Sequence, residues 1–140
     1  MITQKSIWRD NKPGCWVGNV MVRVVEDKPL VDLPESLQQV NGRAAQLIID
    51  GLGGGTYDIW FISGVLRPKP DDVPLRNTIW LLEDTFFFLV IGKIELGATR
   101  ARNQILISGE TSLYDSIEFQ NFWDQIVNKL RPVVLRVRSE

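Results

Sequence analysis

Residues 78–109 read TIWLLEDTFFFLVIGKIELGATRARNQILISG, and the interpretation of the whole chain starts from this stretch. Residues 78–82 are β-branched, aromatic or aliphatic, which indicates a half-buried strand. Glu83 and Asp84 follow, and carboxylates in this place cap a helix and suit its positive end. Residues 86–91 are apolar on every side, so they form either a buried helix, a helix facing an apolar surface that is not protein, or a buried strand. The two acids favour the helix, and a short helix and a strand then complete the stretch.

The composition excludes several functional classes. The 140 residues include 16 basic and 17 acidic side chains, and this balance argues against a general nucleic-acid binder. There is no histidine and only one cysteine, Cys15, so the commonest general base and the cysteine-based metal sites are absent. No apolar run approaches the ~20 residues of a membrane-spanning helix, and residues 1–8 lack the apolar core of a signal peptide. We expect a cytoplasmic protein without a metal or cofactor.

The N-terminal half contains strand, turn and loop signals. Residues 1–15 are polar, and we expect a loosely tethered terminal segment followed by a single α+β domain over residues 16–140. Residues 16–26 place valines at every second position, which predicts a strand. Residues 32–40 predict a short helix, and residues 43–50 predict another strand.

The glycine-rich residues 51–55 lack the lysine and the third spaced glycine of nucleotide-binding loops, so we interpret them as a hairpin turn. Residues 56–64 form the second strand of that hairpin. Both of its faces are largely apolar, which predicts a central strand covered on both sides. Residues 65–76 carry three prolines and predict an exposed loop that could act as a lid.

A long amphipathic helix is predicted near the C-terminus. Residues 115–118 have the spacing of a capping box, and aromatic and aliphatic side chains then recur at helical spacing as far as Leu130. Pro132 is expected to stop this helix, because proline lacks the N–H that a helix interior needs. Residues 133–138 would then form a short strand or tail.

The central part of the chain, about residues 33–130, resembles the sterol carrier protein type-two family of lipid-binding domains. The resemblance rests on the strand at residues 78–81, the Glu83-Asp84 pair, Phe87-Phe88-Leu89, Gly92-Lys93-Ile94, Ala101, residues 105–109, and the helix that begins near Ser112. Residues 46–49 and 57–64 resemble the family's first hairpin. The resemblance implies an α+β fold, with a single mainly antiparallel sheet of about five strands covered by helices. It also implies non-enzymatic carriage of a lipid-like small molecule in an apolar tunnel between sheet and helices.

Nine apolar side chains are the candidates to line such a tunnel: Trp60, Ile62, Trp80, Phe86, Phe87, Val90, Phe119, Phe122 and Trp123. Arg100 and Arg102 are candidates to bind a carboxylate or phosphate head group. We identify no catalytic residues and no metal ligands, because Ser108 lacks a histidine partner and Glu83 and Asp84 suit a helix start better than acid–base chemistry. Two other functions remain open: a protein-interaction or homodimerisation module without a ligand, and an enzyme that uses carboxylates alone.

Overall fold

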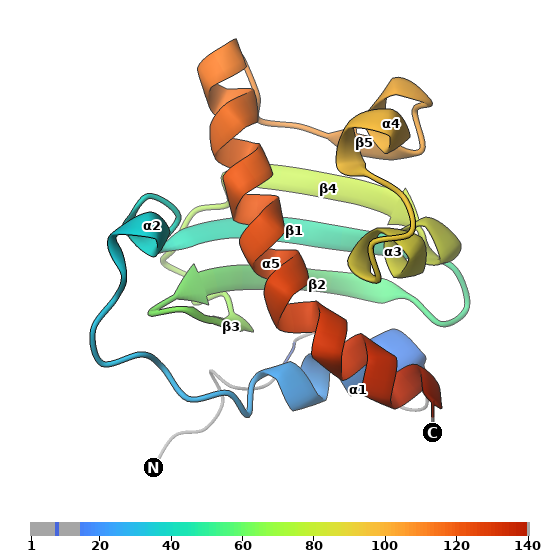
Figure 1. The fold of residues 1–140 in the computed structure, drawn as a ribbon, viewed down its shortest axis with the longest axis horizontal. Coiled ribbons are helices and arrows are strands. Elements are labelled where there is room, and N and C mark those ends of the chain that lie inside the picture. Colours follow the sequence, from blue (N-terminus) through green and yellow to red (C-terminus); the bar gives the residue numbers. More distant parts are fainter. Residues whose placement is uncertain (1–7, 9–14, 140) are drawn as a thin grey trace.

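The computed structural model describes residue 8 and residues 15–139, which form two layers, with a five-stranded sheet on one side and the helices on the other (Figure 1). The strands lie in the order β3-β2-β1-β4-β5. Their bounds are Arg43–Asp50 for β1, Gly55–Ile62 for β2, Val65–Pro68 for β3, Asn77–Leu82 for β4 and Ile105–Ile107 for β5. The β1–β4 pair is parallel and the other three pairs are antiparallel. The predicted α+β class with a mainly antiparallel sheet is confirmed.

The helices are α1 Trp16–Val24, α2 Glu35–Gln38, α3 Glu83–Val90, α4 Leu96–Ala101 and α5 Leu113–Ser139. The predicted helix after Glu83 and Asp84 is thus present as α3, with both acids in its first turn. The predicted hairpin turn at residues 51–55 is also confirmed, since β1 and β2 pair directly on either side of it. The predicted N-terminal segment, residues 1–15, lies outside the described residues except for Trp8 and Cys15.

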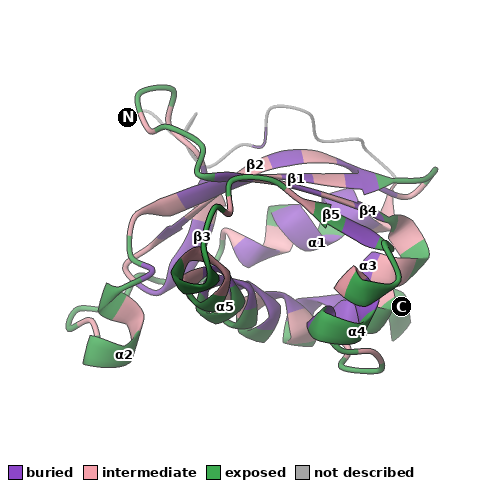
Figure 2. Cartoon of the chain, turned by 90° about the horizontal axis from the view of Figure 1, so that it is seen from above, coloured by how far each residue is buried: buried purple, intermediate pink, exposed green. Residues whose placement is uncertain are grey.

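The core lies between the helices and one face of the sheet (Figure 2). Along β2, Tyr57, Ile59 and Phe61 point into this core and are almost fully buried, whereas Trp60 and Ile62 on the other face are partly exposed. No helix of the described chain covers that second face (Figure 2). The prediction that both faces of this strand are covered is therefore wrong, and the apolar side chains on its outer face remain in partial contact with solvent.

Residues 16–26 form a helix, so the predicted strand is wrong. The valines satisfy a period of two, but the buried residues of α1 are Val17, Gly18, Val20, Met21 and Val24, which follow the helical period instead. Val22, which a period of two places beside Val20 and Val24, is 47% exposed. The tertiary contact with α5 decides between the two patterns, because α1 packs against the C-terminal half of that helix (Figure 1).

Pro132 lies inside α5 and does not end it. Proline here removes one backbone hydrogen bond, but its ring is on the exposed side of the helix. Val133, Val134 and Val137 beyond it are buried, and burying side chains of this size contributes roughly 1.5–3 kcal/mol each. This gain outweighs the cost of the proline, so the predicted strand or tail at residues 133–138 is wrong.

The predicted loop at residues 65–76 is partly wrong, because its first four residues form β3. Ser63 and Gly64 both adopt positive φ angles of 51° and 81°, which reverses the chain within two residues. Val65 then pairs with Ile62 at the sheet edge. The remaining residues, 69–76, are irregular, as predicted.

Candidate functional site

An open groove of about 340 Å³ lies between the end of α3, the start of α4 and the middle of α5, and we call it the α3–α5 groove. It is lined by Leu89, Gly92, Ile94, Glu95, Leu96, Gly97, Gln120, Trp123, Asp124, Val127 and Arg131. These residues come from α3, α4, α5 and the connection between α3 and α4, which the tertiary fold brings together. The groove is the candidate binding site of the described chain.

The floor of the α3–α5 groove is apolar. Leu89, Leu96 and Trp123 are each less than 10% exposed and also belong to the core. The two glycines open the space above them, because Gly92 turns the chain after α3 with a φ of +84° and Gly97 presents no side chain. A Cβ atom at Gly97 would meet no atom within 4 Å, so this position faces free space.

Arg131 provides the cationic group of the groove. Its Nε donates a hydrogen bond of 2.6 Å to the backbone oxygen of Val90, which fixes the guanidinium beside the end of α3. Within residue 8 and residues 15–139, Arg131 forms no ion pair. Its two terminal nitrogens are therefore available for a carboxylate or another anion. Glu95 and Asp124 are the other charged residues of the lining.

The predicted ligand residues fall into separate places. Phe86, Val90, Phe119 and Phe122 are fully buried in the core between sheet and helices. Phe119 packs against Phe122 and Trp123, with a distance of 6.3 Å between ring centroids in each pair. Of the predicted set, Trp123 is the one that also lines the α3–α5 groove. The predicted tunnel contacts of the others stay predictions.

The three consecutive phenylalanines of α3 meet three different surroundings. Phe86 enters the core, and Phe87 packs against Trp16 with a centroid distance of 5.9 Å. The guanidinium of Arg138 lies 5.3 Å from the Phe87 ring, which forms a cation–π contact. Phe88 is 38% exposed. Phe87 is thus covered by Trp16 of α1 and by the Arg138 guanidinium at the end of α5.

The remaining apolar candidates lie on the other face of the sheet. Trp60, Ile62 and Trp80 have side chains on the side that no described helix covers (Figure 2). The indole N–H of Trp60 donates to the backbone oxygen of Gly42 at 3.2 Å. These three residues therefore lie on the opposite face of the sheet from the core phenylalanines, and their predicted ligand contacts also stay predictions.

The predicted head-group arginines do not line the groove. Arg100 donates to both carboxylate oxygens of Glu110, and the Nη1–Oε2 distance is 3.2 Å. Arg102 is exposed. Arg131 was not among the residues predicted from the sequence, although the spacing of residues 120, 123, 124, 127 and 131 places them along one face of a helix. That spacing is a signal which could have identified one wall of the groove.

Glu83 has a different role from the predicted helix cap, since no side chain caps the start of α3. Its carboxylate accepts hydrogen bonds from the indole N–H of Trp16 and from the backbone N–H of Gly53 at 3.2 Å. The Gly53 oxygen in turn accepts from the N–H of Val17. Glu83 therefore ties α1 to the glycine-rich turn and to α3.

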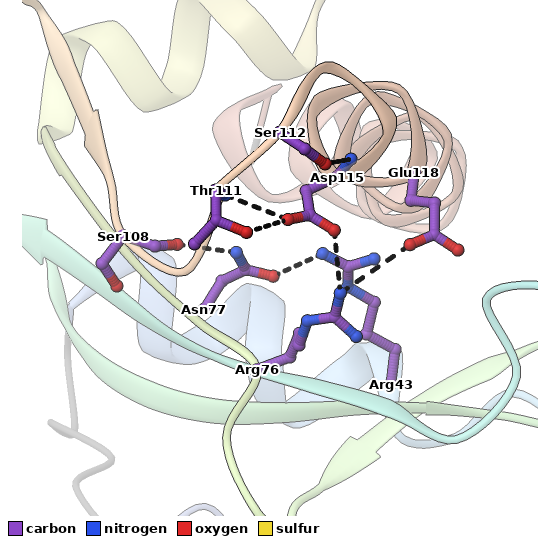
Figure 3. A network of polar contacts seen from close by, with 8 residues as sticks. All are labelled: Arg43, Arg76, Asn77, Ser108, Thr111, Ser112, Asp115 and Glu118. Carbon is purple, nitrogen blue, oxygen red and sulfur yellow. Dashed lines mark hydrogen bonds and ion pairs between the residues drawn. The ribbon is translucent and has the colours of Figure 1, made fainter.

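A polar network closes the other end of the core (Figure 3). Arg43 donates to Asn77 at 2.6 Å, and Arg76 lies 3.3 Å from the Asp115 carboxylate and 3.7 Å from that of Glu118. Burial lowers the pKa of Arg43, and the nearby Arg76 cation lowers it further. Arg43 also lies over the rings of Phe119 and Phe122, at 5.9 and 5.1 Å from their centroids. These contacts fix the start of α5 on the sheet.

Asp115 is held ionised within this network. Hydrogen bonds from the hydroxyl and the backbone N–H of Thr111 lower the pKa of Asp115, with a further contribution from Arg76. The backbone N–H of Asp115 donates to the Ser112 hydroxyl, so the helix start is capped here, three residues before the predicted capping box (Figure 3). In the described part of the chain, no group of three or more His, Cys, Asp or Glu residues could hold a metal ion.

Comparison with known proteins gives a likeness of structure alone. No protein-family model matches the sequence. No curated protein matches it either. The structure is similar to that of sterol carrier protein 2 from Yarrowia lipolytica in its apo form, with 14% identity, a TM-score of 0.49 and coverage of 69% of this chain and 74% of the other. It is also similar to a UbiJ-SCP2 ubiquinone synthesis protein, with 9% identity, a TM-score of 0.47 and coverage of 70% and 73%. Both names belong to the group that the sequence resemblance indicated. Across the described residues, no helix is long and apolar enough to cross a membrane.

Proposed function

We propose that the chain binds the hydrocarbon part of a lipid-like small molecule in the α3–α5 groove and acts as a non-enzymatic carrier. The observation that supports this proposal is the apolar floor of Leu89, Leu96 and Trp123 beneath an opening to solvent. The tunnel expected from the sequence would lie between the sheet and the helices, whereas the proposed site lies among the helices α3, α4 and α5. It shares Trp123 with the predicted set.

The size of the groove suits such a ligand. Its volume of about 340 Å³ falls within the range of roughly 300–1,000 Å³ for small-molecule sites. Each methylene group that leaves water contributes roughly 0.8 kcal/mol. Ordering a flexible chain offsets part of this gain. The part of an acyl chain that leaves water in this open groove would therefore contribute favourably to binding.

Displacement of a fluorescent fatty acid from the purified chain tests the proposal, together with native mass spectrometry of the same preparation. A Gly97→Leu variant adds a large side chain to the groove lining at a position where a Cβ meets no atom within 4 Å, and it is expected to weaken binding by about tenfold or more. Ala101→Leu adds a similar side chain to the same helix outside the groove lining and should leave binding unchanged. Absence of saturable binding, or equal binding by both variants, would refute the proposed site.

Arg131 is the residue to which we assign the head group of the ligand. A carboxylate placed at this end of the groove would meet the two terminal guanidinium nitrogens. Arg131→Gln is therefore expected to weaken binding of a fatty acid but not of the corresponding fatty alcohol. Arg102→Gln serves as the matched control, because Arg102 is exposed and outside the groove.

A further inference from the structure

The face of α5 that forms one wall of the α3–α5 groove continues beyond the groove. Residues 120, 124, 127 and 131 belong to this wall, and at about 100° per residue they fall within an arc of about 60°. Counting back along the same helix, Ile117 and Leu113 fall on the same face, and the whole set then spans about 80°. The wall of the groove therefore extends by two residues towards the start of α5.

These two residues are apolar and exposed to solvent. Ile117 is 54% exposed and Leu113 is 79% exposed. Figure 1 shows that the first turns of α5, which carry both residues, extend past strand β4. We call the pair the α5 shelf. Because apolar side chains in water gain free energy when an apolar group covers them, the shelf is an apolar surface that continues from the groove.

The position of the cation sets the direction of a bound chain. Arg131 is the last residue of α5 in the lining and Gln120 is the first. A hydrogen bond to the backbone oxygen of Val90 fixes the Arg131 guanidinium beside the end of α3. A ligand with its anionic group at Arg131 would extend its hydrocarbon part over Trp123 towards Gln120. Ile117 is the next residue on this face, so it lies where the chain would leave the groove.

Two polar side chains lie between Arg131 and the shelf, and both belong to the rim of the groove. Gln120 and Asp124 are exposed, and the Gln120 Nε2 donates a hydrogen bond of 2.9 Å to Oδ1 of Asp124. Their polar groups therefore bind each other and water at the rim. Trp123 is only 3% exposed, and it keeps the floor apolar along the same turn of the helix.

We propose that the α5 shelf holds the far end of the ligand's hydrocarbon chain, so that the site selects long chains. This inference rests on the proposed binding of a lipid-like molecule in the groove. At about 1.5 Å per residue, Arg131 lies about 16–17 Å from Gln120 along the helix axis and about 21 Å from Ile117. An extended chain advances about 1.2 Å per bond, because three backbone bonds span roughly 3.3–3.6 Å. A chain of about 12 carbons therefore ends inside the groove, and one of about 18 carbons reaches Ile117.

The small area of the shelf favours a chain that is already bound in the groove over a separate partner. A specific protein–protein interface buries about 800 Å² on each partner, which is far more than two side chains offer. A chain anchored in the groove has already lost most of its freedom, so further contacts add directly to its affinity. A methylene that leaves water completely gains about fourfold in affinity, and one covered on a single side gains about twofold.

Competition between the fluorescent fatty acid and two acids of different length tests this inference on the full chain. Dodecanoic and octadecanoic acid are compared below the concentrations at which they form micelles, and the wild type is expected to bind the longer acid at least about tenfold more tightly. Ile117→Ser should weaken binding of octadecanoic acid by about fivefold and of dodecanoic acid by less than about twofold. Leu135→Ser is the matched control, because Leu135 is 51% exposed on the same helix but lies beyond Arg131, away from the shelf. It should leave both affinities unchanged.

The two acids separate failure of the shelf from failure of the groove. An unchanged affinity of Ile117→Ser for octadecanoic acid, or an equal loss for both acids, overturns the role of the shelf. A larger effect of Leu135→Ser than of Ile117→Ser overturns it as well, because the chain would then extend past Arg131 in the other direction. If the wild type binds neither acid, the proposed function itself fails. Binding of dodecanoic acid that is sensitive to Gly97→Leu, without a gain for the longer acid, retains the groove and overturns the shelf alone.

Discussion

Replacing Pro132 by alanine should stabilise the protein, because α5 continues through this residue to Ser139. Proline in a helix interior costs about 3 kcal/mol relative to alanine, through the missing N–H and the clash with the carbonyl four residues earlier. Alanine also frees the unfolded chain, which offsets about 0.4–1 kcal/mol of this gain. Because Pro132 is exposed, its replacement leaves the packing of the core unchanged. The folded helix has already relaxed around the proline ring, which relieves part of the proline cost. We therefore expect a net gain in the free energy of unfolding of about 1–2 kcal/mol.

Thermal unfolding followed by circular dichroism checks this expectation. For a chain of this length, 1–2 kcal/mol corresponds to a rise in melting temperature of about 3–8 °C. Pro74→Ala in the irregular segment before β4 is the control, and it should lower stability by up to about 1 kcal/mol because only the unfolded-state effect applies there. An unchanged or lower melting temperature for Pro132→Ala, with normal behaviour of the control, would show that α5 is not a continuous helix.

Three further perturbations test other parts of the structure. Gly54→Ala should lower the free energy of unfolding by at least about 2 kcal/mol in chemical denaturation, because its Cβ would collide with the backbone oxygen of Ile49. Gly97→Ala should raise it by about 0.5–1 kcal/mol, because Gly97 lies in a helix with open space around its Cβ position. Glu83→Gln should cost about 1–2 kcal/mol in urea unfolding by weakening the bonds from α1 and the glycine-rich turn, while the exposed Asp84→Asn changes less than about 0.5 kcal/mol. Because the pKa of Asp115 is lowered in the folded state, its contribution to stability is present above the ordinary aspartate value of about 3.9 and is lost as the pH falls below it. The free energy of unfolding of Asp115→Asn should therefore be lower than that of the wild type at pH 7, and the two values should converge in strong acid. A constant difference at all pH values would contradict the lowered pKa of Asp115.

Several elements could be predicted from local sequence alone. The strands at Arg43–Asp50 and Gly55–Ile62 and the glycine-rich turn between them follow from alternation and from the backbone freedom of glycine. The start of α3 follows from two carboxylates before an apolar run. The long apolar stripe of α5 follows from helical spacing. In each case neighbours in sequence supply the whole signal.

The outcome at α1 shows where local signals fail. Its valines satisfy strand and helix periods together, and the choice depends on contact with the far end of α5, more than a hundred residues away. Pro132 gives the complementary example. Its intrinsic cost predicts a helix end, but the burial of the valines beyond it provides a larger stabilisation that is visible only once α1 and the core are in place.

The sequence by itself determined the class of the fold, the absence of histidine chemistry and the surplus of aromatic side chains around Phe86. Only the tertiary structure decided where those side chains go. The α3–α5 groove joins Leu89, Leu96 and Trp123 from three elements, and Trp60 and Trp80 lie on the opposite side of the sheet. The physical reason is that hydrophobicity drives a side chain out of water without specifying its neighbours, which are set by how helices and strands pack in space.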